Sequence, residues 1–216
     1  MMTMPFFSTG LILEYDKSPY NNQWNRINST NKKHSDIYRL LLNAMEEPFD
    51  MNKQMMNRDF YEFCVELIES RGVAIQEIAE VTYDLQKPYL DGITIEDAEK
   101  AVRAVLHKRE AQFAIMTGLE LDRLAEEGLL QGPIADIIKH DFSLYGVDEI
   151  MALSVVNVFG SIGLTNFGYL DKAKSGVIRE IDEKSRNPEQ VNTFFDDLIC
   201  AIAAAAASKM AHQFIW

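Results

Sequence analysis

The longest apolar run of the chain, residues 198–207 (LICAIAAAAA), consists mainly of alanine. A membrane-spanning helix needs about 20 apolar residues, and this run is roughly half as long, so it predicts a helix inside a folded domain. Alanine has the highest helix propensity of any residue, and its small side chain lets a neighbouring helix approach closely. The run therefore predicts a tightly packed helix that begins near Thr193.

Apolar residues recur at helical spacing through most of the chain before this run, as at Phe60, Phe63 and Leu67. Gly72 suits the end of a helix, and residues 94–97 (TIED) form a loose capping box that opens another. The predicted helices cover residues 58–70, 73–86, 94–109, 111–127, 134–140, 147–160 and 177–184, and a further one begins near Ile37. No segment has a convincing strand pattern, so the predicted fold class is all-α.

Composition and periodicity divide the chain into two parts. Residues 1–34 are rich in asparagine and serine without a helical or strand period, which predicts a polar appendage, disordered or loosely tethered. Residues 35–216 carry the helical patterns and are predicted to form a single domain. The whole chain of 216 residues is long enough to bury a sizeable core.

The charge balance limits the partners of the chain. Its 21 Lys and Arg face 33 Asp and Glu, a formal net charge of −12, which argues against nucleic acid and against tight docking on anionic lipid. Two cysteines form no disulfide framework, and no secretory signal or spanning segment is found, so a soluble, cytoplasmic protein is expected. A peripheral membrane contact and a homodimer stay open.

Two pairs of adjacent carboxylates stand at the start of apolar helical stretches: Asp148 with Glu149, and Asp196 with Asp197. One explanation is that acids in a first helical turn complement the macrodipole and the free N–H groups. The other is that the two helices pack side by side with these ends together. Four converging anions would then require a divalent cation or protonation, and Mg²⁺ prefers such oxygen ligands.

Residues 161–176 (SIGLTNFGYLDKAKSG) lie between the two acidic pairs. Gly160, Gly163 and Gly168 predict a glycine-rich loop here, whose backbone could approach a ligand closely. Asp171 and Lys174 follow, and a lysine supplies a point charge for phosphate. A solvated turn with ordinary surface lysines is the alternative explanation for this segment.

Two segments together resemble the bacterial phosphatidylglycerophosphatase A family: residues 145–178 (YGVDEIMALSVVNVFGSIGLTNFGYLDKAKSGVI) and 194–212 (FFDDLICAIAAAAASKMAH). The chain is most similar to the Gram-positive branch of this family, the low-temperature requirement C proteins, over about residues 57–213. The likeness to the membrane-bound phosphatase covers about residues 145–212. The spanning helices and glycine-rich N-terminal motif of that enzyme have no counterpart here.

This resemblance implies a compact bundle with one central helix surrounded by others, and a Mg²⁺-dependent hydrolase that converts phosphatidylglycerophosphate to phosphatidylglycerol and phosphate. Where the family usually has proline after its motif lysine, this chain has Ser175. The family's Asp-Glu, Asp-x-x-Lys and Asp-Asp motifs match Asp148 and Glu149, then Asp171 and Lys174, then Asp196 and Asp197.

Our hypothesis from the sequence is that both acidic pairs hold Mg²⁺, that Asp171 ligates it or orients a water, and that Lys174 neutralises phosphate charge on a lipid head group or small phosphomonoester. One alternative is a non-catalytic helical interaction module in which the acids only cap helices. Another is an all-α, Mg²⁺-dependent nucleotide pyrophosphatase, suggested by residues 77–80 (EIAE). That class needs acids spaced i, i+3 on one helix pair, which the two doublets do not show.

Overall fold

The computed structural model describes residues 58–183, 187 and 189–214, with the side chain of Phe214 left out. The predicted appendage over residues 1–34, its boundary at residue 35 and the helix near Ile37 lie outside the described residues. The described helices belong to one compact unit, Asp59–Trp216. They are α3 (Tyr61–Ser70), α4 (Ile75–Gln86), α5 (Ile95–Leu106), α6 (Arg109–Glu126), α7 (Pro133–Lys139), α8 (Val147–Val156), the 3₁₀ turn η2 (Asn157–Phe159), α9 (Ser161–Ala173), α10 (Val177–Asp182) and α11 (Phe195–Phe214).

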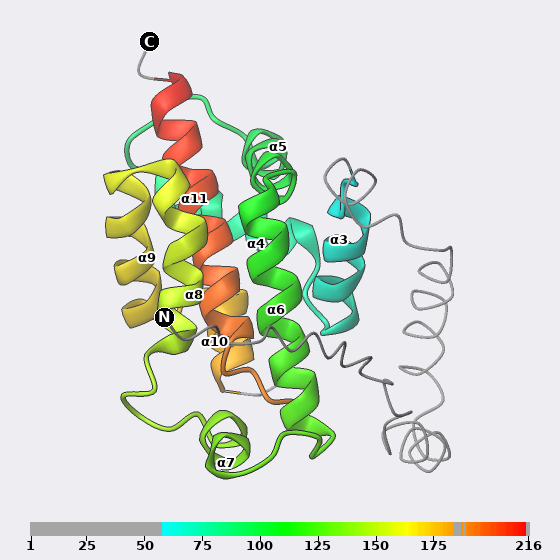
Figure 1. Cartoon of the computed structure of the whole chain (residues 1–216). Helices are drawn as coiled ribbons and strands as arrows, with labels where there is room; N and C mark the ends of the chain where they lie inside the picture. The colour runs from blue at the N-terminus through cyan, green and yellow to red at the C-terminus, as the bar shows by residue number, and fades with distance from the viewer. Residues whose placement is uncertain (1–57, 184–186, 188, 215–216) are drawn as a thin grey trace, which may run out of the picture. The chain divides into compact units, whose positions relative to one another are not determined.

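Helix α11 is the centre of the bundle. It contacts α4, α5, α6, α8, α9 and α10, and Figure 1 shows it running between α8 and α9 on one side and α4 and α6 on the other. Every side chain of its alanine-rich stretch, residues 198–207, is at most 1% exposed. The predicted all-α bundle with a central helix is therefore confirmed for the described residues, which contain no strand.

Local signals explain where several helices begin and end. The predicted capping box is present at the start of α5: Asp97 N donates to Thr94 Oγ1 at 3.2 Å, and Thr94 N donates to Asp97 Oδ2 at 3.2 Å. Gly72 follows α3 with a φ of +87°, the left-handed conformation that glycine adopts readily. In the part of the chain that the structure describes, no helix is long and apolar enough to cross a bilayer.

The predicted glycine-rich loop after residue 160 is wrong, because α9 occupies Ser161–Ala173. Gly163 is a packing residue inside this helix: a Cβ there would stand 3.0 Å from Val156 Cγ1 and 3.6 Å from Ser208 Cβ. Gly160 alone keeps the expected turn conformation, with a φ of +80° at the start of α9. At Gly163, close packing against α8 and α11 thus outweighs the low helix propensity of glycine.

Gly118 has a comparable role in α6, which packs on both α8 and α11. A Cβ at this position would stand 2.6 Å from Leu198 Cδ1, 3.0 Å from Phe194 Cβ and 3.2 Å from Met151 Sδ. Gly118→Ala is therefore expected to lower the free energy of unfolding by about 1–3 kcal/mol through overpacking, measured by urea denaturation.

Gly168→Ala is the matched control for this prediction. Gly168 is also inside a helix, but no atom lies within 4 Å of the position of its Cβ. Alanine there should raise the free energy of unfolding by up to about 1 kcal/mol, because only helix propensity changes. If both substitutions stabilise the protein equally, the packing role of Gly118 is wrong.

Candidate active site

Three helix ends far apart in the sequence meet at one end of the bundle: the start of α8, the end of α9 and the start of α11 (Figure 1). They enclose a pocket of about 200 Å³ together with the loop of residues 140–146. All six residues singled out in the sequence line this pocket: Asp148 and Glu149 from α8, Asp171 and Lys174 from α9 and its C-cap, and Asp196 and Asp197 from α11.

The carboxylates reach the pocket because each pair occupies the first turn of its helix. Asp148 is 8% exposed, and its Oδ1 accepts a hydrogen bond from Glu149 N at 2.9 Å. Asp196 and Asp197 are 8% and 4% exposed. Gly146, with a φ of +64°, lets the chain turn into α8 at the edge of the pocket.

Another residue shares the capping at the start of α11, because it accepts two of the amides that lead into this helix. The carboxylate of Asp122, on α6, accepts Phe194 N at 3.1 and 3.2 Å and Phe195 N at 3.0 Å. Asp122 is fully buried, and burial raises its pKa well above the ordinary value. The side chains of Asp196 and Asp197 are thereby left to face the pocket.

A second buried contact fixes the segment before α11. Arg71 Nη2 donates to Glu126 Oε1 at 2.7 Å, to Asn192 Oδ1 at 3.2 Å and to the carbonyl oxygen of Val191. Glu126 Oε1 also accepts Val191 N at 2.9 Å. With Asp122, these side chains bind the backbone of residues 191, 194 and 195, which fixes the segment that leads into the acidic pair of α11.

Lys174 places its ammonium among the carboxylates. Its Nζ lies 2.7 Å from Asp196 Oδ2, 3.1 Å from Asp171 Oδ1 and 3.7 Å from Asp182 Oδ1. Burial by itself would lower the pKa of Lys174. The charge of Asp196 and its hydrogen bond raise this pKa by more than burial lowers it, so the lysine stays charged. It is the positive charge that allows these acids to lie together.

The single ammonium of Lys174 does not neutralise the carboxyl groups around it. Seven of the residues that line the pocket carry a carboxyl group, against Lys174 alone. Burial, followed by the nearby charge of Asp196, raises the pKa of Asp197 to about 8. Burial also raises the pKa of Asp196 to about 6 although Lys174 opposes the shift, and burial with the neighbouring Asp148 raises that of Glu149. The site favours added positive charge, as protons or as a bound cation.

The side-chain arrangement does not itself form a finished metal centre. Among the described residues, no three His, Cys, Asp or Glu side chains are grouped so that they could hold a metal ion. The donor chemistry nevertheless fits Mg²⁺, a hard cation that takes one or two carboxylates and completes its shell with water and phosphate. The carboxylates of Asp148, Glu149, Asp196 and Asp197 are the oxygens that could hold it.

Sequence reasoning missed several residues of this pocket. Asp141, Asp182 and Thr193 line it, yet none belongs to a local motif that marks it. Backbone conformation gives a signal that only the structure contains: the non-glycine residues with positive φ in the described ranges are Asp141 (+49°), Leu144 (+69°) and Lys174 (+44°). All three line the pocket, and strained backbone tends to cluster at functional sites.

Residues 69–212 match the family model described as Phosphatidylglycerophosphatase A, which is well over half of the chain. The chain belongs to the phosphatidylglycerophosphatase A family. The match runs from the end of α3 into α11 and so includes all six predicted site residues, which confirms the family membership predicted from the sequence motifs.

Several known proteins are similar to this chain over most of its length. The uncharacterized protein YpjQ of Bacillus subtilis (strain 168) is 47% identical over 169 residues, which are 78% of this chain and 87% of YpjQ. A solved structure of the low temperature requirement C protein from Listeria monocytogenes has a TM-score of 0.70 at 46% identity and covers 73% of this chain and 98% of its own. A protein of unknown function from Bacillus stearothermophilus gives a TM-score of 0.71 at 46% identity, over 74% of this chain and 99% of its own.

The residues that suggested a nucleotide pyrophosphatase have another role. Glu77 caps α4, where its Oε2 accepts Ala74 N at 2.8 Å. Neither Glu77 nor Glu80 lines the pocket of the acidic pairs. The structure therefore gives no observation that favours this alternative.

Proposed function

We propose that this protein is a Mg²⁺-dependent phosphomonoester hydrolase that converts phosphatidylglycerophosphate to phosphatidylglycerol and phosphate. The observation that carries the proposal is the convergence of the three family motifs, from α8, α9 and α11, in one acidic pocket with a charged lysine. The family description supports the reaction class and the lipid substrate.

In this mechanism, Mg²⁺ would be held by carboxylates drawn from Asp148, Glu149, Asp196 and Asp197, with Asp171 as a further ligand or as the residue that orients water. Bound Mg²⁺ supplies Lewis-acid polarisation of the phosphoryl oxygens and lowers the pKa of its water. Lys174 contributes a fixed positive charge where the phosphate group gains negative charge in the transition state. A carboxylate of the pocket that is not a ligand takes the proton of the attacking water. The phosphorus–oxygen ester bond then breaks, and the glycerol oxygen leaves with a proton.

Phosphate release from phosphatidylglycerophosphate in mixed micelles tests the proposal directly. We expect release with Mg²⁺ and none with EDTA, and we expect Mg²⁺ to raise the thermal midpoint because it binds only the folded pocket. A protein that releases phosphate from no phosphomonoester and whose melting ignores Mg²⁺ would instead be the non-catalytic helical module.

A further inference from the structure

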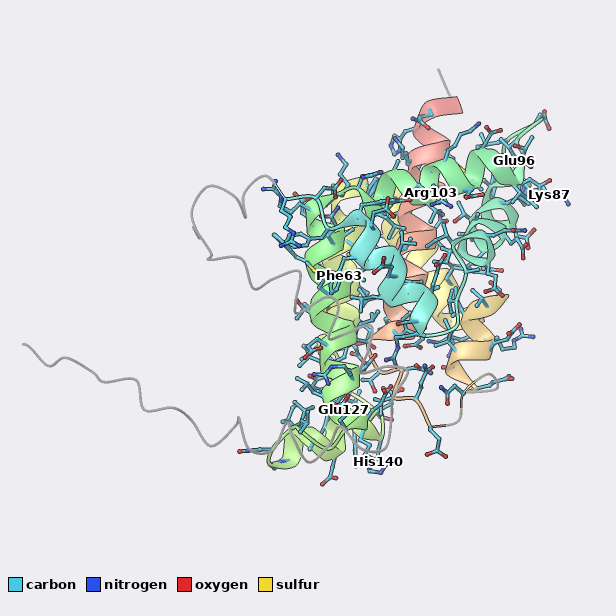
Figure 2. The ribbon with its side chains drawn as sticks, turned by 90° about the vertical axis from the view of Figure 1, so that its right-hand side faces the viewer. Phe63, Lys87, Glu96, Arg103, Glu127 and His140 are labelled. Atoms are coloured by element: carbon cyan, nitrogen blue, oxygen red, sulfur yellow. The ribbon has the colours of Figure 1, made fainter. Side chains whose placement is uncertain are left out.

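Helix α6 carries two carboxylates that the proposed reaction does not use. Asp122 is fully buried, and Glu126, one helical turn later, is partly buried. Neither side chain lines the acidic pocket. Figure 2 shows Glu127, which follows Glu126 in the chain, at the same end of the bundle as His140, where the loop of residues 140–146 begins. The two carboxylates therefore lie at the end of the bundle that holds the pocket, without belonging to its lining.

Both carboxylates bind the backbone that leads into α11. Asp122 accepts Phe194 N at 3.1 and 3.2 Å and Phe195 N at 3.0 Å. Glu126 Oε1 accepts Val191 N at 2.9 Å. The acidic pair of α11 follows directly in the chain, so these contacts from α6 fix the backbone next to it.

The start of α11 has a side chain of its own that could cap it, and this side chain is used elsewhere. Asp196 N donates to the carbonyl oxygen of Asn192 at 3.3 Å, which puts Asn192 in the capping position. An asparagine there ordinarily accepts the N–H groups two or three residues later, and here Asp122 accepts them. Asn192 Nδ2 donates instead to the carbonyl oxygen of Ile181 in α10 at 3.1 Å. The start of α11 is thus attached to neighbouring helices, where a local cap would leave it independent of them.

Arg71 supplies the positive charge beside these contacts. Its Nη2 donates to Glu126 Oε1 at 2.7 Å and to Asn192 Oδ1 at 3.2 Å, and its guanidinium lies 5.2 Å from the centre of the Phe195 ring. Buried ion pairs are a weak source of stability, because removing charges from water costs about as much as their attraction contributes. What Arg71 and the α6 carboxylates supply is a fixed geometry at the start of α11.

We propose that Asp122 and Glu126 are positioning residues, which fix the start of α11 so that Asp196 and Asp197 face the other carboxylates of the pocket in the geometry that the reaction needs. This inference rests on the proposed function, since it assumes that the acidic pair of α11 helps to hold Mg²⁺. Both residues act through the backbone of residues 191–195. A shift of about 1 Å in a reacting group can lower a rate by about 10², so such contacts matter for catalysis.

The same chemical change at the two positions is expected to have different outcomes. Both oxygens of Asp122 accept backbone N–H groups, so Asp122→Asn places an NH₂ group, which only donates, against a donor. A single oxygen of Glu126 accepts both Val191 N and Arg71 Nη2, so the conservative variant Glu126→Gln keeps both hydrogen bonds. If the carboxylates served only to balance Arg71, Glu126→Gln would have the larger effect, because Glu126 forms the direct ion pair.

The test compares these variants in the full chain, with phosphatidylglycerophosphate at saturating Mg²⁺ and by calorimetric titration of Mg²⁺ without substrate. We expect Asp122→Asn to lower kcat by about tenfold to a hundredfold, with KM nearly unchanged because Lys174 keeps its place on α9. Its affinity for Mg²⁺ should fall by about tenfold or more, as when a residue that orients a metal ligand is lost. Glu126→Gln should keep both quantities close to wild type. Wild-type kcat and Mg²⁺ affinity in Asp122→Asn, or a larger loss in Glu126→Gln, overturn the inference.

Thr82→Val is the control for a general loosening of α11. Thr82 is fully buried on α4, and its hydroxyl donates to the carbonyl oxygen of Ala203, in the middle of α11, at 3.4 Å. This variant should lower the thermal midpoint but keep the kcat and the Mg²⁺ affinity of the wild type. If it lowers them as much as Asp122→Asn does, the position of the acidic pair is not the cause, and the inference fails.

A second variant keeps the test decisive if Asp122→Asn does not fold. Glu126→Leu removes the acceptor of Val191 N at a side chain that is 23% exposed. Its affinity for Mg²⁺ should fall below that of Glu126→Gln, and equal affinities overturn the inference.

The Mg²⁺ titration also separates this inference from the proposed function. If the wild type binds Mg²⁺ but releases no phosphate, the proposed function fails, while a lower Mg²⁺ affinity in Asp122→Asn than in Thr82→Val still supports the positioning role. If the wild type and Asp122→Asn release phosphate equally fast, the proposed function stands and the positioning role is overturned. A wild type that binds no Mg²⁺ overturns both.

Discussion

Asparagine in place of Asp197 is expected to make the metal-free protein more stable at pH 8 while it removes both the response to Mg²⁺ and the phosphatase activity. Asp197 is 4% exposed and lies among carboxylates that oppose its ionisation. A neutral amide of nearly the same shape relieves that repulsion but is a poor substitute for a charged ligand. We expect kcat/KM to fall by at least about two to three orders of magnitude, as for other groups that stabilise transition-state charge.

The pH dependence follows from the raised pKa of Asp197, about 8 in the folded protein against an ordinary value of 3.8. Between these two values the folded state binds a proton that the unfolded state has released. The free energy of unfolding in EDTA should therefore fall as pH rises from about 4 to about 8, and the fall should be on the order of several kcal/mol at about 1.4 kcal/mol per pKa unit. Asp196, with a pKa of about 6, shifts stability in the same direction.

Urea denaturation of wild type and Asp197→Asn at several pH values in EDTA checks this prediction. The variant should lose much of the fall in stability between pH 4 and pH 8, and its thermal midpoint should not respond to Mg²⁺. Asp84→Asn is the control, since Asp84 is exposed on α4 and does not line the pocket. A variant that is less stable than wild type at pH 8 in EDTA, or that still responds to Mg²⁺, contradicts the assignment of Asp197 to the acidic site.

Methionine in place of Lys174 is expected to have the second large effect, on activity and on folding together. Lys174 Nζ is the ammonium that the carboxylates of Asp171, Asp182 and Asp196 face. Its loss should lower kcat by about 10² to 10³, because a positive charge preorganised for the phosphate is removed. The metal-free protein should also lose about 2 kcal/mol of stability at pH 8, since a partly buried carboxylate is left without its partner.

Lys172→Met separates these effects from a general change of charge. Lys172 lies on the same helix but is exposed and does not line the pocket, so kcat and stability should stay close to wild type. Steady-state kinetics on phosphatidylglycerophosphate and urea denaturation measure both quantities. If Lys172→Met and Lys174→Met have the same kcat, the lysine at the pocket has no special role in the reaction.

Helix propensity and helical spacing are properties of short segments, and they predicted the helices and the acidic pairs. The alanine run predicted α11 because helix propensity and small side chains are properties of the residues themselves. The acidic pairs were visible because each precedes an apolar stretch at helical spacing. Motif resemblance then supplied the family and the central position of α11, which no single segment encodes. The roles of the six site residues and of Mg²⁺ stay predictions.

What the sequence could not supply depends on contacts between distant segments. Asp122 lies 72 positions before Phe194, whose amide it accepts, and nothing in its own helix marks it. Gly163 was misread for the same reason: it packs on Ser208, which lies 45 positions later in the chain, as well as on the nearby Val156. Tertiary packing decided these positions.

The alanine core of α11 also has an evolutionary consequence. Enlarging a side chain among residues 198–207 would push on helices from several directions at once, since each of these positions is at most 1% exposed. The loop of residues 140–146 can vary without such a penalty because much of it faces solvent. Descendants of this domain that acquire new substrates should therefore diverge first in that loop, while the helix beneath it stays nearly fixed.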